Sequence, residues 1–215
     1  MIKAWPLQNT KIRQLPLSSL TRDVIPYDPN DPSPTVGGQT LRPDLLQGPQ
    51  DQRSVEARDD ISCAQSEIFD SPLTVFSVST SDTDIAVRVM DVYPDGRSML
   101  MLDFAQRLRF MNGDYTRAGY KLLTPGQKYE HTFVSPDIAL TFLSKHRFRI
   151  CFSGSNYPRF ARNMNTGLED MYPSNSPDDG TGKWNSKEHQ LDPLDSPVTT
   201  SINLLDVRVK YTAPA

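Results

Sequence analysis

Apolar and polar residues alternate along several short segments of the chain, which is the pattern of strands that bury one face. The alternation is clearest in Ile85–Met90, Arg147–Phe152 and Leu205–Tyr211. Successive strand side chains point to opposite faces. The pattern therefore assigns these residues to the apolar faces of the three strands: Ile85, Val87 and Val89; Phe148, Ile150 and Phe152; and Leu205, Val207, Val209 and Tyr211. It assigns these to the opposite faces: Ala86, Arg88 and Met90; Arg147, Arg149 and Cys151; and Asp206, Arg208 and Lys210. Strands with one apolar face require a second sheet to pack on.

Turn signals separate these segments. Tyr93-Pro94-Asp95-Gly96, Asn112-Gly113-Asp114 and Thr124-Pro125-Gly126 combine residues that set or tolerate turn geometry. Many short strands with regular turns and no long helical period predict an all-β protein. We expect a β-sandwich, specifically a jelly roll.

The first quarter of the chain has a different character. Six prolines between Pro26 and Pro49 exclude a helix or a central strand there. The segment is predicted to be an arm that lies over another part of the protein. We expect a lead-in arm and entry strand over residues 1–60 and a sandwich over 61–215, as one domain. A long polar loop is predicted at about 168–200, with Trp184 as its one large apolar residue.

Composition limits the function. The chain has 215 residues and a formal net charge of −3, without a basic stripe for a phosphate backbone, so nucleic acid is not an expected partner. Its apolar runs are too short to cross a membrane, and Met1-Ile2-Lys3-Ala4-Trp5-Pro6 does not begin a secretory signal. These features favour a soluble, cytoplasmic protein.

The cysteines and histidines of the sequence do not indicate a metal site or a catalytic site. Cys63 and Cys151 both fall in predicted strands, where two buried thiols are favoured over a disulfide. The spacing of cysteines and histidines matches no metal site, and no cofactor is predicted. A serine hydrolase needs a Gly-x-Ser-x-Gly elbow, and the nearest sequence, Gly154-Ser155, has no second glycine. Ser155 is therefore not expected to be a nucleophile.

Three groups of charged residues have both structural and functional interpretations. Asp82 and Asp84 are candidates for a paired general acid and base or, with Asp91, for calcium ligands. Carboxylates beside a strand start more often satisfy turn N–H groups, and this structural role is favoured. The series Asp28-Asn30-Asp31 is read as extended arm and not as a metal loop. Arg159 and Arg162 flank Phe160, a core or interface aromatic, and are suited to clamping a carboxylate; pairing with Asp82, Asp84 or Asp95 is favoured.

Several motifs resemble, in order, the C-terminal non-catalytic domain of the X-Pro dipeptidyl-peptidase, cocaine esterase (CocE/NonD) and α-amino acid ester hydrolase family. They are the arm Tyr27–Gly38 with its Gly-Gly pair, Asp51-Gln52 with Arg58-Asp59-Asp60, the block Asp82–Ser98, His146-Arg147, and Ser155-Asn156-Tyr157-Pro158 through Gly167. Three departures stand out. The segment Pro72–Ser79 is shorter than in the family, Lys145 replaces a glycine before His146, and the tail after Gly167 differs.

The resemblance implies a galactose-binding-like jelly roll without its own catalytic residues. The partner implied is an α/β-hydrolase catalytic domain, in cis or in trans, that hydrolyses esters or X-Pro dipeptides; homo-oligomers are also implied. Gln39, Thr40 and Leu41, after the Gly-Gly pair, are the implied contacts near the active-site entrance. The residues implied to have structural roles are Asp82, Asp84, Asp91, Asp95, Gly96, His146, Arg147, Asn156, Pro158, Asn163 and Asn165.

Two further expectations concern surfaces. If the catalytic domain is absent, the segment from Tyr27 to Leu46 is expected to be a bare apolar patch that is mobile or held by self-association. The rival hypothesis is a stand-alone module that binds carbohydrate or another ligand, for which Tyr157, Tyr172 and Trp184 are the candidate aromatics. His131 and His189 lie in no motif, and surface positions are expected for both.

Overall fold

The computed structural model describes residues 10–16, 19–37, 51–66, 72–136, 143–167 and 198–214. Within these ranges it contains strands, one short α-helix and two 3-10 turns. In chain order they are β1 (Thr10–Pro16), β2 (Val24–Tyr27), α1 (Arg53–Glu56), β3 (Ile61–Ser66), β4 (Pro72–Val78), β5 (Asp84–Val92), β6 (Ser98–Arg107), η1 (Leu108–Phe110), η2 (Arg117–Gly119), β7 (Tyr129–Thr132), β8 (Arg147–Ser153) and β9 (Thr200–Pro214). In this part of the chain no helix is long and apolar enough to cross a membrane.

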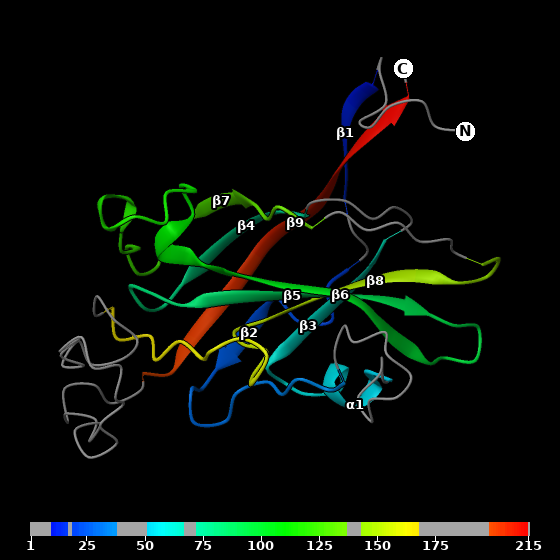
Figure 1. The fold of residues 1–215 in the computed structure, drawn as a ribbon, viewed down its shortest axis with the longest axis horizontal. Helices are drawn as coiled ribbons and strands as arrows, with labels where there is room; N and C mark the ends of the chain where they lie inside the picture. The colour runs from blue at the N-terminus through cyan, green and yellow to red at the C-terminus, as the bar shows by residue number, and fades with distance from the viewer. Residues whose placement is uncertain are drawn as a thin grey trace, which may run out of the picture.

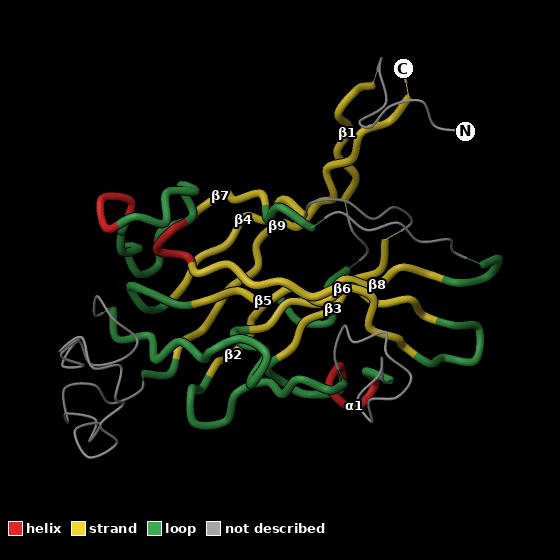
Figure 2. The backbone as a smooth tube through the Cα atoms, in the orientation of Figure 1, coloured by secondary structure: helices red, strands yellow, loops and turns green. Residues whose placement is uncertain are grey.

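The strands form two antiparallel sheets that face each other (Figure 1). The first has the order β1-β9-β4-β7, with β2 also paired to β9, and the second has the order β3-β8-β5-β6. Figure 2 shows the same arrangement as a tube, with loops at both ends of the strands. The predicted β-sandwich is therefore confirmed, and its assignment as a jelly roll stays a prediction.

The core between the sheets is built from the alternation seen in the sequence. Both sheets contribute to one apolar cluster, which includes Phe76 and Ile202 from the first and Val87, Ile150 and Phe152 from the second. Arg147 and Arg149 lie outside it, as predicted. Phe148 is only half-buried and is not one of the residues of this cluster.

The predicted core position of Leu205 is wrong. Leu205 is 48% exposed, whereas Leu204 and Val207 are buried. The cause is a β-bulge: Phe76 pairs with Leu204 and Val75 pairs with Asp206, so Leu205 is skipped in the β4–β9 register. Because an extra residue reverses the alternation, the inward positions of β9 change from even-numbered residues, Ile202 and Leu204, to the odd-numbered Val207.

The lead-in contributes strands to the first sheet. β2 contains Pro26 and pairs with residues 200–203 of β9, at the sheet edge where a missing N–H costs little. β1 pairs with residues 208–214 of the same strand. The proposed division at residue 60 thus separates segments that share one sheet. The predicted loop at 168–200 lies outside the described residues except for its last three, and β9 begins at Thr200.

Candidate functional site: the anchored arm

The outer face of the second sheet is buried instead of facing solvent. A second apolar cluster lies there, made of Val55, Ile61, Cys63, Met90, Leu100 and Cys151, with Val36 packed against it. Val36 belongs to the arm and Val55 to α1, so these two segments cover the sheet. The face that the sequence pattern marked as polar is therefore a second interior.

Arg88 holds the arm from inside this face. Its side chain is 2% exposed, and its guanidinium donates to the hydroxyls of Ser153 (2.7 Å) and Ser33 (3.1 Å) and to the carbonyl of Pro34 (3.1 Å). Burial lowers its pKa to about 10. Arg88 stays charged at neutral pH, and its hydrogen bonds to the arm offset part of the desolvation cost.

Asn156 and Asp103 complete the same network. The side-chain oxygen of Asn156 accepts a hydrogen bond from Arg88 (3.1 Å), and its Nδ2 donates to Asp103 (2.8 Å). Asp103 also forms an ion pair with Arg159, at 2.7 Å. Arg159 pairs within the domain, as predicted. Its partner is Asp103 instead of the predicted Asp82, Asp84 or Asp95. Arg162 donates to the carbonyl of Pro29 at 2.9 Å, so it also binds the arm.

The arm itself pairs with the strand-end motif through its backbone. Pro34 and Tyr157 form an isolated parallel bridge. Thr35 N–H donates to the carbonyl of Tyr157 (2.6 Å), and Tyr157 N–H donates to that of Ser33 (3.0 Å). The peptide bond between Tyr157 and Pro158 is cis. The expectation of a bare arm is therefore wrong for Tyr27–Gly37, which packs on its own sandwich through buried polar partners. The expected mobility of the arm stays a prediction.

A second anchor holds the chain where it returns at Asp51. Gln52 N–H donates to the carbonyl of Ser98 at 2.7 Å, and Asp51 bridges to Met99 on β6. The Gln52 side-chain amide donates to the carbonyl of Val36 at 2.8 Å. This bond, which we call the clasp, joins the two ends of the segment between Val36 and Gln52. Gln39, Thr40 and Leu41 belong to that segment and lie outside the described residues.

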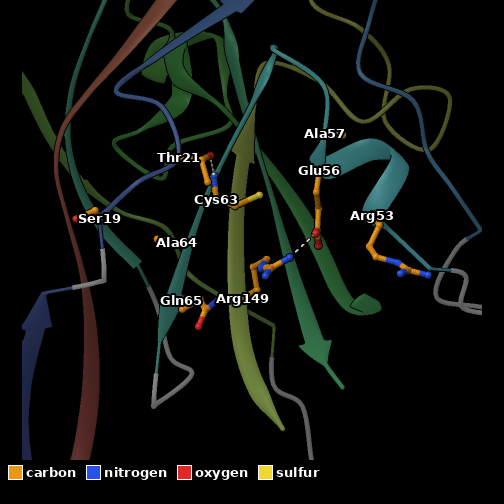
Figure 3. A pocket seen from close by; sticks show the side chains of 9 residues that line it. All are labelled: Ser19, Thr21, Arg53, Glu56, Ala57, Cys63, Ala64, Gln65 and Arg149. Carbon is orange, nitrogen blue, oxygen red and sulfur yellow. Dashed lines mark hydrogen bonds and ion pairs between the residues drawn. The ribbon is translucent and has the colours of Figure 1, made fainter. Parts of the chain in front are cut away.

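A hollow of about 600 Å³ opens beside α1. Figure 3 shows Arg53 and Glu56 from α1 on one side of it and Thr21, Cys63 and Arg149 on the other. Glu56 forms an ion pair with Arg149 that ties α1 to β8. Thr21 accepts a hydrogen bond from Cys63 N–H (2.9 Å) at the edge of β3. These contacts hold α1 and the arm against the second sheet. The charged groups of the hollow are paired, Glu56 with Arg149 and Arg53 with Asp51.

The prediction of two free thiols is wrong. Cys63 and Cys151 form a disulfide that joins β3 to β8. The two residues are direct register partners in this pair, with Cα atoms 4.0 Å apart. Register cannot be read from the sequence separation of 88 residues, so the strand assignments were right while the pairing was missed.

Asp82 and Asp84 lie where the resemblance implied a structural role, but their partners are side chains. Asp82 is fully buried and forms an ion pair with Arg109. Asp84 pairs with Arg107 at 3.2 Å, and the amide of Asn163 donates to both carboxylates at 2.8 Å. Burial raises the pKa of Asp84, and the charge of Arg107 opposes that shift. The expected capping of backbone N–H groups is therefore replaced by pairing with guanidinium groups.

Asn163 and Asn165 extend this network. The carbonyl of Asn163 accepts a hydrogen bond from the buried Tyr27 hydroxyl at 2.8 Å, and burial raises the pKa of Tyr27. Asn165 N–H donates to the side chain of Asn163 (2.9 Å), and the Asn165 amide donates to the carbonyl of Val198 (2.6 Å). The motif thus joins the lead-in, β5 and the approach to β9.

The remaining motif residues lie in strand ends and turns at the other end of β5. His146 Nδ1 is 2.8 Å from a carboxylate oxygen of Asp91, a residue of β5. Gly96 has φ +89° in the β5–β6 turn, where Asp95 pairs with Arg97. Lys145, at the position of the family's glycine, has φ 71°. Arg147 is exposed and donates to the side chain of Gln65.

Several residues weighed as catalytic or metal-binding candidates have structural contacts. The Ser155 hydroxyl is buried and accepts the N–H of Ser33 at 2.8 Å. Across the described ranges no three His, Cys, Asp or Glu residues gather as a metal site would require. Asp28 accepts the N–H of Asn30 (2.8 Å) in a turn that follows β2. His131 is only partly exposed on β7. Of the candidate ligand aromatics Tyr157 is 42% exposed, while Tyr172 and Trp184, like His189, lie outside the described residues.

Sequence reasoning missed Arg88, Asp103 and Ser33, which form the centre of the arm's anchor. Arg88 was assigned to a solvent face because alternation alone cannot show that both faces of a strand are covered. A signal was present: Arg88 is the single charged residue within Ile85–Met90. Strands buried on both faces read as nearly continuous apolar runs.

Comparison with known proteins gives two kinds of match. Residues 3–192 match the model of the X-Pro dipeptidyl-peptidase C-terminal non-catalytic domain. The cocaine esterase of Rhodococcus sp. (strain MB1 Bresler) is 35% identical over 154 residues, which is 67% of this chain and 26% of the esterase. The chain thus spans about a quarter of the length of this curated relative.

Two solved structures share the fold. An aminopeptidase from a marine sediment Thaumarchaeota archaeon superimposes with a TM-score of 0.65 and 20% identity, over 92% of this chain and 34% of the aminopeptidase. An α-amino acid ester hydrolase superimposes with a TM-score of 0.64 and 19% identity, over 94% of this chain and 33% of the hydrolase. In both, the matched part is about a third of a longer chain.

Proposed function

Because the chain belongs to the X-Pro dipeptidyl-peptidase C-terminal non-catalytic domain family, we propose that it packs on an α/β-hydrolase catalytic domain, in cis or in trans. In this role it presents the segment between Val36 and Gln52, with Gln39, Thr40 and Leu41, at the entrance of that domain's active site. The parent activity is hydrolysis of esters or X-Pro dipeptides. Support of oligomers belongs to the same proposal.

The anchoring of the arm is the observation that carries this proposal. The family's motif residues, including Gln52, Asn156 and Tyr157, make internal hydrogen bonds that hold the arm at two points. Such a buried polar network does not create a reactive group; it fixes position. What it positions is the segment closed by the clasp, which lies between the two anchors.

A chimeric enzyme provides the test. The C-terminal domain of the Rhodococcus cocaine esterase is replaced by this chain, and ester hydrolysis and its thermal half-life are compared with those of the esterase truncated before that domain. We expect the chimera to retain activity longer than the truncated enzyme. Substituting Gln39, Thr40 and Leu41 together by alanine should change KM or kcat in the chimera. The same substitutions should leave the unfolding midpoint of the isolated chain unchanged.

Equal half-lives for the chimera and the truncated enzyme would count against the proposal. The isolated chain itself should not hydrolyse p-nitrophenyl acetate or Gly-Pro-p-nitroanilide, because its sequence has no Gly-x-Ser-x-Gly elbow to expose a nucleophilic serine. A rate that copurifies with the chain and disappears in Ser155→Ala would show an activity of its own.

A further inference from the structure

The disulfide belongs to a row of side chains that crosses the outer face of the second sheet. Cys151 on β8 has Cys63 of β3 as its register partner on one side and Arg88 of β5 on the other. Arg88 is paired in turn with Asp103 of β6. Opposed side chains of antiparallel strands share a face, and their Cβ atoms lie about 4.5–5.5 Å apart. The disulfide therefore stands next to Arg88, which donates to Ser33 of the arm.

β3 is attached to the sandwich through its outer face. It is an edge strand that pairs with β8. None of the side chains described in β3 belongs to the apolar cluster between the sheets, whereas Ile150 of β8 does. Cys63 belongs instead to the outer cluster, together with Val55 of α1 and with Val36 of the arm packed against it. The disulfide thus joins the inner sandwich, through β8, to an outer layer that consists of β3, α1 and the arm.

The hollow beside α1 gives one of the two sulfurs a route to solvent. Cys63 lines this hollow of about 600 Å³, and Figure 3 shows its sulfur projecting from β3 toward the side of α1. Cys151 is not one of the residues that line the hollow, and it is fully buried on β8, between β3 and β5. A thiol that enters the hollow therefore meets Cys63 first.

Cationic side chains flank the other sulfur. Arg88 lies beside Cys151 in the row, and Arg149 precedes Cys151 by two residues on the same face of β8. Arg149 is itself paired with Glu56. Positive charge stabilises a thiolate, and a stabilised thiolate is the better leaving group in disulfide exchange. Cys151 is therefore suited to leave when Cys63 is attacked.

We propose that this disulfide is a thiol-exchange site, which a small thiol opens from the hollow, and that its redox state sets how firmly the arm is seated. The thiolate of the small thiol attacks Sγ of Cys63 and forms a mixed disulfide. The bond between the two cysteines breaks, and Cys151 leaves as a thiolate that takes a proton from water. A second small thiolate attacks the sulfur of the first, which frees Cys63 and gives the disulfide of the small thiols. The electrons that the small thiols lose reduce the protein disulfide to two thiols.

Reduction of the folded chain tests the route. Dithiothreitol is added without denaturant, the free thiols are alkylated at intervals, and mass spectrometry counts the labelled cysteines. The rate should be nearly independent of urea below the unfolding transition, because attack from the hollow does not require global unfolding. Ala57→Trp narrows the hollow and should slow reduction about tenfold, since exchange depends on access. Ser54→Trp is the matched control, because Ser54 is exposed on α1 and does not line the hollow; its rate should not change.

Single-cysteine variants show which sulfur is accessible. Cys63 in the Cys151→Ala variant should react with 5,5′-dithiobis(2-nitrobenzoate) about tenfold faster than Cys151 in the Cys63→Ala variant, because it alone lines the hollow. Circular dichroism confirms that both variants are folded. Equal rates for the two thiols would overturn the assignment of Cys63 as the attacked sulfur.

Hydrogen exchange measures the consequence for the arm. In the reduced wild type and in the Cys63→Ala, Cys151→Ala double variant, the amides of β3, Thr35 and Gln52 should exchange faster than in the oxidised chain. The amides of β5 should stay protected, because the inner cluster holds that strand. Unchanged exchange at Thr35 and Gln52, reduction that accelerates with urea as global unfolding does, or a normal rate for Ala57→Trp would overturn the proposal. Any effect on an attached enzyme rests on the proposed function, but these experiments use the isolated chain and can fail independently of the chimera.

Discussion

The two outer faces of this sandwich are built from similar strands but have opposite environments. On the first sheet the outer side chains of β9 include Asn203, Asp206 and Arg208, which are partly or fully exposed. On the second sheet the outer face holds Arg88, Asp103 and Met90, which are buried under the arm and α1. When an ion pair on the first face breaks, water solvates both charged groups. On the second face a charged group that loses its partner has no water to replace it. The same residue type therefore has a different energetic weight on each face.

Removing one arginine from each face should give the largest contrast. Arg88→Met leaves the buried oxygens of Ser33, Ser153 and Asn156 without their shared guanidinium donor, and we expect the free energy of unfolding to fall by about 3–5 kcal/mol. Arg208→Met removes an exposed ion pair with Asp206 and should cost less than about 1 kcal/mol. Urea denaturation of both variants measures the difference. Equal losses would mean that the covered face is not an interior.

The disulfide offers a second measure of the covered face. Replacing Cys63 and Cys151 together by alanine should lower the free energy of unfolding by about 2–4 kcal/mol, because a crosslink over a long loop restricts the unfolded chain. Reduction with dithiothreitol should produce a similar loss in the wild type and none in the double variant. If the reductant leaves the wild-type unfolding midpoint unchanged, the two sulfurs are not bonded in solution.

A smaller effect is expected at Lys145, in the turn that enters β8. Its φ of 71° lies in the left-handed region, which costs a non-glycine residue roughly 1 kcal/mol. Lys145→Gly should therefore raise the free energy of unfolding by up to about 1 kcal/mol, less the backbone entropy of glycine. Lys145→Ala serves as the control, since it removes the charge but keeps the strain. A gain shared by both variants would assign the effect to charge.

The smallest effect is expected in the pH dependence of the free energy of unfolding. Burial makes the pKa of Asp84 higher in the folded protein than its ordinary value of 3.8, so the folded state binds this proton more tightly than the unfolded chain does. The stabilisation of the folded state that comes from this proton is complete at low pH, and it is lost as the pH rises through the pKa of Asp84 in the folded protein. The difference in unfolding free energy between wild type and Asp84→Asn should thus shift against the wild type as the pH rises above about 3.8. A pH-independent difference would contradict this assignment.

The inner core was predictable from sequence, and the covered outer face was not. Ile150 and Phe152 followed from alternation because burial between sheets is a property of one strand at a time. Leu205 was misplaced because a bulge depends on the partner strand. The disulfide and the arm's anchor depend on register and on contacts over more than 50 residues, such as Arg88 with Ser33. Local patterns carry no record of such contacts, although the motif residues did mark where they occur.

The clasp between Gln52 and Val36 has a consequence for how this domain can vary over evolutionary time. It closes the intervening segment at its base, so insertions or substitutions there leave the anchoring contacts on either side in place. Such a segment works as an exchangeable cassette. The length and sequence of this segment can therefore change during evolution without changing the contacts that stabilise the sandwich.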